Sequence, residues 1–247
     1  MSDISNEHMK RNYEIIYEDG FLVIANKTAG LLSIPDRYQP EKINLQHLLK
    51  QQFGEIWTVH RLDKDTSGLI CFARNEEAHK TLSQQFEKRQ VQKIYHALVD
   101  GNLKEDKGTI DQPIGKGQGN KMQITKTGKA ALTLYQVEQR YKHFNWVAVE
   151  IKTGRTHQIR VHFQAIGHPL AVDTLYGQRD ALFLSEIKTK AYRLGKNKEE
   201  RPLLSRLSLH ASSLSLAHPE TGKPVQFTAP LPKDLRAALN QLNKWGV

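Results

Sequence analysis

Cysteine and long apolar segments are almost absent from this chain, and each deficit excludes a class of protein. Cys71 is the only cysteine among 247 residues, so no intramolecular disulfide can form. No apolar run approaches the roughly 20 residues that span a bilayer. The opening residues, MSDISNEHMKRNYE, lack the apolar stretch and the cleavage site of a secretory signal. We therefore expect a cytoplasmic protein without a membrane partner.

Acidic residues are outnumbered by basic ones. The chain has 36 Lys and Arg against 26 Asp and Glu, a formal net charge of +10. Binding to a polyanion releases counterions from its phosphates, so this surplus favours a nucleic acid as partner. It carries no information about which bases are bound.

Several nucleotide, hydrolase and metal motifs are also missing. The chain has no phosphate-binding P-loop, no Rossmann glycine pattern and no Gly-x-Ser-x-Gly elbow, which disfavours ATP, NAD and α/β-hydrolase chemistry. His157 and His162 are five residues apart rather than four, and no Glu follows His157. We expect neither a metal ion nor a cofactor.

The apolar periodicity predicts an α+β fold. We expect a polar, flexible tail over 1–12 and one domain over 13–247, because no repeat or low-complexity linker divides the chain. The expected elements are a β-hairpin over 13–27, helices over 44–53, 76–89, 156–166 and 233–245, and strands over 93–99, 130–140, 144–151 and from 209.

Two basic segments interrupt these elements. Residues 108–128 contain five glycines and predict a basic surface loop or hairpin. Residues 188–206 carry seven basic side chains against two glutamates, which predicts an exposed, mobile excursion. Such a charge run is consistent with an ordinary solvated surface or with an RNA contact.

The densest charged cluster is HRLDKDTSG at 60–68, between two extended runs. Asp63 lies between Arg61 and Lys64, whose positive charges favour an ionised carboxylate that can act as a nucleophile or a base. A solvated salt-bridge loop would have the same composition. These residues alone do not separate Asp63 from Asp65.

A second cluster, KTGRTHQIRVH, occupies 152–162. If it opens a helix, Arg155 lies near the positively polarised N-terminus, which is a natural phosphate site. Arg160 then falls about one and a half turns later, on a different part of the surface.

Together, HRLDKDTSGL at 60–69 and GRTHQIRVHFQAIGHPLAVDTLYG at 154–177 resemble the signature motifs of the RluA-like family of pseudouridine synthases. The resemblance extends through YEDGFLVIANKTAGLLSIP at 16–35, VQKIYHALVDG at 91–101 and LHASSLSLAHPETGKPVQFTAPLP at 209–232. It implies a pseudouridine-synthase-type domain, in which a mostly antiparallel mixed β-sheet is flanked by helices and loops. Because the first matching motif begins close to the start of the sequence, we expect no small S4-type RNA-binding domain of the kind that many relatives have before it.

The resemblance also implies a reaction, the isomerisation of uridine to pseudouridine in structured rRNA or tRNA, without cofactor or metal. Asp63 is then the catalytic carboxylate, which either attacks ribose C1′ or removes a C2′ proton. Arg160 is similar to the family arginine that pairs with this aspartate. Tyr95 looks like the tyrosine that lies against the target base and accepts the C5 proton.

A stacked uridine must be flipped out of the RNA to reach Asp63. Arg61 resembles the arginine that stabilises the flipped nucleotide, although a simple phosphate contact fits equally well. Lys93 and Arg155, within the matching segments, are further candidate RNA contacts. We expect a monomer.

Two other functions compete with this interpretation. A non-catalytic RNA-binding protein on the same fold would be expected to have lost Asp63, which is present. A hydrolase that releases the base would normally need a pair of carboxylates, and only Asp63 has a motif behind it.

Overall fold

The computed structural model describes residues 12–119, 121–188, 192–193 and 199–247. Apart from Asn12, the tail predicted over 1–12 lies outside these residues. Contacts divide the chain into two compact units, of which the first contains the residues up to Ile94 and His210–Pro230. The second contains Tyr95–Leu209 and Leu231–Val247. Because the units are interleaved along the chain, they are not successive domains, and the single domain over 13–247 stays a prediction.

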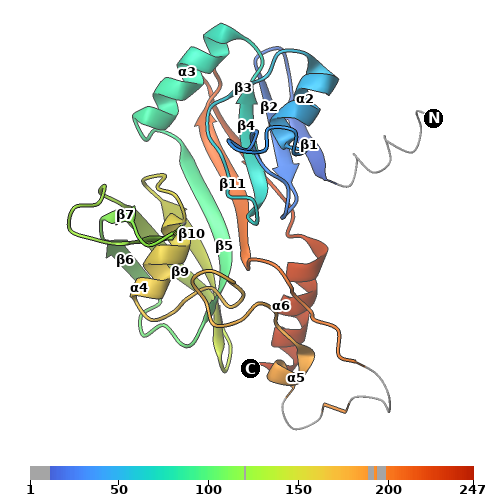
Figure 1. The fold of residues 1–247 in the computed structure, drawn as a ribbon, viewed down its shortest axis with the longest axis vertical. Coiled ribbons are helices and arrows are strands. Elements are labelled where there is room, and N and C mark those ends of the chain that lie inside the picture. Colours follow the sequence, from blue (N-terminus) through green and yellow to red (C-terminus); the bar gives the residue numbers. More distant parts are fainter. Residues whose placement is uncertain (1–11, 120, 189–191, 194–198) are drawn as a thin grey trace. The chain divides into compact units, whose positions relative to one another are not determined.

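The first unit is built on a mixed sheet (Figure 1). The predicted hairpin is confirmed, since β1 and β2 pair antiparallel; β2 pairs antiparallel with β4, and β4 pairs parallel with β11. The strand β12, which the sequence analysis missed, pairs antiparallel with β11. The strands are β1 (Tyr13–Glu18), β2 (Leu22–Lys27), β3 (Trp57–Thr58), β4 (Ser67–Ala73), β11 (Leu209–Ala217) and β12 (Pro224–Thr228).

Two helices of the first unit begin directly after an asparagine. The Asn44 side chain accepts a hydrogen bond from His47 N and caps α2 (Leu45–Phe53), and Asn75 does the same for α3 (Glu76–Glu87). Both helices bury an apolar face. The core against α3 includes Leu22, Ile24, Leu69, Cys71, Ala78, Leu82 and Leu214.

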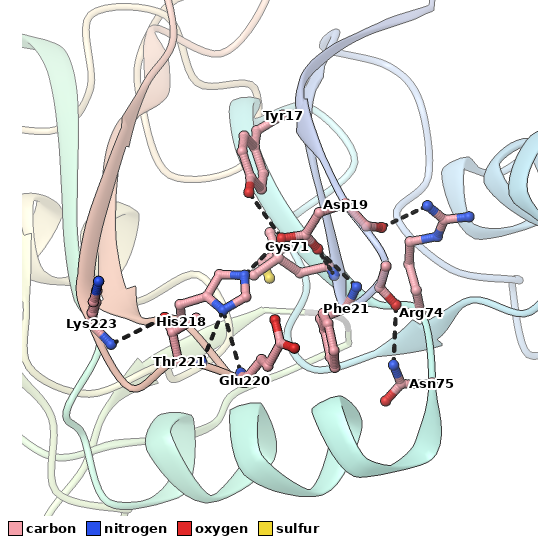
Figure 2. A network of polar contacts seen from close by, with 12 residues as sticks. Tyr17, Asp19, Phe21, Cys71, Arg74, Asn75, His218, Glu220, Thr221 and Lys223 are labelled. Carbon is pink, nitrogen blue, oxygen red and sulfur yellow. Dashed lines mark hydrogen bonds and ion pairs between the residues drawn. The ribbon is translucent and has the colours of Figure 1, made fainter.

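A polar network joins two turns of this unit (Figure 2). Asp19, in the β1–β2 turn, accepts hydrogen bonds from Phe21 N and Leu22 N, and its other carboxylate oxygen lies 2.7 Å from His218 Nε2. The ring of His218 accepts from Glu220 N at 3.3 Å through Nδ1. The turns that follow β1 and β11 are therefore fixed to one another.

The second unit holds paired strands, of which β9 is antiparallel to both β10 and β6, and a separate hairpin. The strand β5 begins in the first unit and continues into the second, where the order is β5, β10, β9, β6. The hairpin predicted within 108–128 is confirmed as β7–β8, and the strand β6 before it was not predicted. The strands are β5 (Gln92–Asp100), β6 (Lys107–Asp111), β7 (Ile114–Lys116), β8 (Met122–Ile124), β9 (Leu132–Arg140) and β10 (Phe144–Ile151).

The helices of the second unit are α4 (Gln158–Ala165), α5 (Leu184–Ile187) and α6 (Lys233–Trp245). The prediction for α6 is confirmed, whereas α5 was not predicted. The helix expected over 156–166 begins two residues later, because its N-cap, His157, has the left-handed φ of 56°. The α+β class, with a mixed and mostly antiparallel sheet, is confirmed.

The excursion predicted over 188–206 needs a partial correction. Residues 189–191 and 194–198 lie outside the described part of the chain. At the far end, however, Leu204 is buried, and Arg206 binds Asp234 of α6 through Nε and Nη2, both at 2.8 Å. The end of this segment is therefore fixed, and it is not exposed throughout. Across the described ranges, no helix is both long and apolar enough to cross a membrane.

Candidate active site

Asp63 lies in the loop between β3 and β4, and the residue before it is held firmly. Leu62 is buried. Its carbonyl accepts a hydrogen bond from the Ser33 hydroxyl at 2.8 Å, and its N–H donates to the same hydroxyl oxygen at 3.1 Å. The backbone leading into Asp63 is thus fixed from a neighbouring loop.

The residue after Asp63 is held by a buried lysine. The carbonyl of Lys64 accepts hydrogen bonds from Gly30 N and from Lys27 Nζ, both at 2.9 Å. Lys27 is only 1% exposed, and its ammonium also donates to the carbonyls of Leu31 and Thr28. A buried cation is tolerated only when it is hydrogen-bonded, and here three carbonyls supply those bonds. The sequence analysis missed this role of Lys27.

The two aspartates of the loop differ in their surroundings. Asp63 is half-buried, and its carbonyl accepts a hydrogen bond from Thr66 N at 3.1 Å, which closes a turn. Asp65, within that turn, is exposed, as is Arg61. The two aspartates therefore differ in burial, which the sequence alone does not reveal.

His60 is held in its neutral form beside Lys93. The ring stacks on Phe86 with centroids 4.5 Å apart, and its Nε2 accepts a hydrogen bond from Cys71 N at 2.9 Å. An accepting Nε2 places the proton of the neutral ring on Nδ1. Burial, with a contribution from the Lys93 charge, lowers the pKa of His60 to about 3.

Lys93 and Cys71 are also affected by burial. The Lys93 ammonium lies 5.8 Å from the centroid of the Phe86 ring, and desolvation lowers its pKa. Desolvation raises the pKa of the Cys71 thiol, so this cysteine is not a ready nucleophile. In the ranges that the structure describes, no group of three or more His, Cys, Asp and Glu side chains is arranged to hold a metal ion.

Arg160, in α4 of the second unit, forms a buried ion pair with Asp173. Its Nε and Nη2 donate to the two carboxylate oxygens at 2.7 and 2.6 Å. The expectation that Arg160 lies on the surface is therefore wrong, because the side chain is turned inward onto a carboxylate. Asp173 also accepts from Leu175 N and Tyr176 N. The pairing of Arg160 with Asp63 stays a prediction.

Tyr176 connects this ion pair to the hairpin β7–β8. The Arg160 guanidinium lies 4.9 Å from the centroid of the Tyr176 ring. The hydroxyl accepts a hydrogen bond from Met122 N of β8 at 2.7 Å and lies 2.8 Å from His157 Nδ1. A single side chain thus contacts the arginine, the start of α4 and the hairpin. Asp173 and Tyr176 lie within the segment 154–177 that resembles the family motif. Their partners are distant in sequence, so no local sequence pattern identifies these two residues.

Arg155 lies just before the N-terminus of α4, outside its first turn. It precedes α4 by three residues, and its Nε donates to the Ala130 carbonyl at 3.0 Å. The backbone N–H of Arg155 donates a hydrogen bond to the side-chain oxygen of Gln158. The side-chain nitrogen of Gln158 in turn donates to Leu132 O. A phosphate or RNA contact by Arg155 stays a prediction.

Tyr95 is 7% exposed and lies in β5, where the second unit begins. Asp63 belongs to the first unit, whereas Tyr95 and Arg160 belong to the second. The backbone around Asp63 and the side chain of Arg160 are each fixed by contacts within their own unit. That these three side chains form one site stays a prediction.

Comparison with known proteins identifies the class. The family model described as RNA pseudouridylate synthase matches residues 21–165. The dual-specificity RNA pseudouridine synthase RluA of Vibrio vulnificus is 39% identical over 216 residues, which cover 84% of this chain and 79% of the relative. The ribosomal large subunit pseudouridine synthase D of Pseudomonas aeruginosa is 38% identical over 94% of this chain and 72% of the relative.

Solved structures agree with this result. Human RNA pseudouridylate synthase domain containing 1 superposes with a TM-score of 0.68 at 28% identity, covering 90% of this chain and 84% of that one. The resemblance to pseudouridine synthases of the RluA-like family is confirmed. This chain belongs to the RNA pseudouridylate synthase family, whose members are isomerases.

Proposed function

We propose that this protein converts specific uridines in structured rRNA or tRNA to pseudouridine, with Asp63 as the catalytic carboxylate. The observation that carries the proposal is the way the backbone is held on both sides of a half-buried carboxylate. Leu62 is fixed by Ser33, and Lys64 by Lys27 and Gly30. A catalytic group must be held close to its productive geometry, and these contacts do so without covering Asp63.

The reaction breaks the bond between ribose C1′ and base N1, rotates the retained base and joins C1′ to C5. The C5 proton then leaves. Asp63 either attacks C1′, forming an ester that the base later displaces, or removes a C2′ proton to give a glycal. Both routes begin from an ionised aspartate.

Tyr95 and Arg160 take the remaining roles in the proposal. Tyr95 lies against the base, and its oxygen accepts the C5 proton. Arg160 orients Asp63 through its guanidinium, whose plane Asp173 fixes at two nitrogens. A planar fork held in this way has little rotational freedom left, so it can position a second carboxylate at low entropic cost.

A uridine in folded RNA must leave its stack before it can react, at a cost of a few kcal/mol. The exposed Arg61 next to Asp63 is suited to stabilise the flipped nucleotide or to contact its phosphate. Lys93 and Arg155 are proposed as further RNA contacts. The enzyme is expected to act in the cytoplasm as a monomer, without a cofactor or metal.

The test exchanges the two loop carboxylates separately. RNA from a strain lacking this protein is labelled with [5-³H]uridine, and tritium release is measured for the wild type, Asp63→Asn and Asp65→Asn. We expect Asp63→Asn to abolish release while it retains RNA binding, because the volume is conserved and only the charge is lost. Asp65→Asn, the matched control, should keep most of the activity.

Two results would contradict the proposal. Substantial tritium release by Asp63→Asn would remove this residue from catalysis, and loss of release only in Asp65→Asn would transfer the role to Asp65. Free uracil among the products of the wild type would indicate a hydrolase that releases the base.

A further inference from the structure

The loop over residues 34–43 is a closed excursion that starts beside Asp63. Ser33, from which it departs, is hydrogen-bonded in both directions to Leu62. The loop returns at Asn44, where Leu45 N donates to the Leu32 carbonyl at 2.8 Å and Gln46 N donates to the Ser33 carbonyl at 3.1 Å. Both ends are therefore joined to each other and to the segment that carries the catalytic aspartate.

This loop exposes large side chains to an unusual degree. Tyr38 is 85% exposed and Ile43 is 64% exposed, and both lie within six residues of each other. Single exposed apolar residues are common and need no explanation, but an almost fully exposed aromatic ring in a loop next to a catalytic group is typical of a contact surface. The Arg37 guanidinium lies 5.9 Å from the centroid of the Tyr38 ring, which adds a positive charge at the same place.

The backbone that presents Tyr38 is ordered by Asp36. One carboxylate oxygen of Asp36 accepts hydrogen bonds from Tyr38 N at 2.8 Å and from Gln39 N at 3.1 Å. The hydrogen bond from Tyr38 N lowers the pKa of the Asp36 carboxyl, so the turn is kept at neutral pH. Pro40 restricts the following backbone further. An aromatic residue presented from an ordered turn loses little entropy when it binds.

We propose that Tyr38 is a stacking platform for a nucleobase that flanks the target uridine, with Arg37 contacting the same nucleotide. The inference rests on the proposed function and adds a subsite to it. Every base offers a π-face, so an exposed ring binds RNA with little sequence preference, and an adjacent arginine adds cation–π and phosphate contacts. A protein partner is not favoured, because the exposed apolar side chains are too few for a protein interface with an apolar core.

The length of the loop limits which nucleotide is bound. Tyr38 is five residues from Ser33 and therefore at most about 18 Å from it, even in a fully extended chain. Stacked nucleotides rise about 3.4 Å each along a strand, so the platform contacts a base of the same RNA segment as the target uridine and not a distant one. A base that is unstacked when the target flips out can be restacked on Tyr38, which offsets part of the cost of flipping.

The experiment compares Tyr38→Ala, Tyr38→Phe and the matched control Gln39→Ala, which shortens an exposed side chain of the same turn. Binding is measured with a fluorescein-labelled 20-nucleotide single-stranded RNA at several salt concentrations, and turnover by tritium release from the labelled cellular RNA. Loss of one stacked base by alanine substitution costs about 1–3 kcal/mol, so Tyr38→Ala should raise Kd and KM about 5- to 150-fold. We expect an unchanged kcat and an unchanged salt slope, because no phosphate contact is lost.

Tyr38→Phe and Gln39→Ala should behave like the wild type. If Tyr38→Ala binds RNA as tightly as Gln39→Ala, the platform does not exist. If Tyr38→Phe is as weak as Tyr38→Ala, the hydroxyl rather than the ring makes the contact, and the stacking proposal is wrong. Failure of the proposed function is a different result, since the wild type itself would then release no tritium.

Discussion

Arg160 and Asp173 form a bidentate ion pair whose side chains are 7% and 0% exposed. Two charges in this position are tolerated because each carboxylate oxygen and two of the guanidinium nitrogens are hydrogen-bonded. The pair fixes the plane of the guanidinium within α4. The same ion pair therefore stabilises the second unit and holds the arginine that is proposed to orient Asp63.

Asp173→Asn should therefore be strongly destabilising. The substitution keeps the size of the side chain but removes the buried negative charge that accepts from two guanidinium nitrogens and from the N–H groups of Leu175 and Tyr176, so about 3–5 kcal/mol of unfolding free energy is expected to be lost. Urea unfolding checks the value. Asp234→Asn is the matched control, because its bidentate pair with Arg206 is 41% exposed at the carboxylate and should cost about 1 kcal/mol or less. Equal losses in the two variants would contradict the prediction.

The sequence predicted local structure better than long-range partners. The hairpin β1–β2, the asparagine caps of α2 and α3, and α6 follow from apolar spacing and capping residues within a few positions of one another. The start of α4 was wrong because His157 adopts a left-handed φ, which periodicity does not reveal. The strands β6 and β12 and the fixed end of the 188–206 segment, which were not predicted, also depend on tertiary contacts.

The candidate site shows the same division. The motif around Asp63 was recognisable in the sequence, because its residues are consecutive. The supporting residues were not, since Lys27 and Ser33 reach this loop from 37 and 29 positions away. Asp173 lies 13 residues from Arg160 and has no periodic relation to it. Placing such partners requires the folded chain.

Tyr95→Phe should separate contact with the base from proton transfer. The ring without a hydroxyl can still pack in β5 and against a base, so RNA binding is expected to survive while turnover falls. A general base that is positioned in the transition state typically contributes about 10²- to 10⁴-fold, which sets the expected loss of kcat. Tritium release measures turnover, and a titration with labelled RNA measures binding. A variant with normal turnover would show that the C5 proton leaves through another group.

His60 predicts a specific dependence of stability on pH. Burial lowers its pKa to about 3 in the folded protein, whereas the ring titrates near 6.5 in the unfolded chain. Between these values the unfolded state binds a proton that the folded state does not, so this contribution is present above pH 6.5 and is lost as the pH falls towards 3. One such group changes the unfolding free energy by up to about 1.4 kcal/mol per pH unit.

His60→Gln tests this contribution. The glutamine carbonyl can still accept a hydrogen bond from Cys71 N, but it does not titrate. Urea unfolding between pH 7 and pH 4.5 should therefore give a shallower loss of stability for the variant than for the wild type. His79→Gln, at a partly buried histidine on α3, is the control and should follow the wild type. Parallel curves for His60→Gln and the wild type would mean that the ring does not stay neutral.

The hairpin β7–β8 predicts how RNA affinity depends on salt. Residues 113–129 carry four exposed lysines and no acidic side chain, namely Lys116, Lys121, Lys126 and Lys129. Tyr176 holds the hairpin through Met122 N, so these charges are presented on an anchored element. Each phosphate contact on a single strand contributes about 0.7 to the slope of log affinity against log salt. Replacing Lys116, Lys121 and Lys126 by glutamine should therefore reduce that slope by about 2 if all three contact phosphates.

The modified uridine should not change in this triple variant, because phosphate contacts position a protein and do not read bases. Mapping pseudouridines in RNA treated with each protein tests this point. Lys104, Lys107 and Lys233 are exposed lysines of the same unit, and their joint replacement by glutamine is the control for a general loss of three charges. An equal reduction of the slope in both variants would show that net charge, and not the hairpin, attracts RNA. A new target uridine would show that the hairpin takes part in recognition.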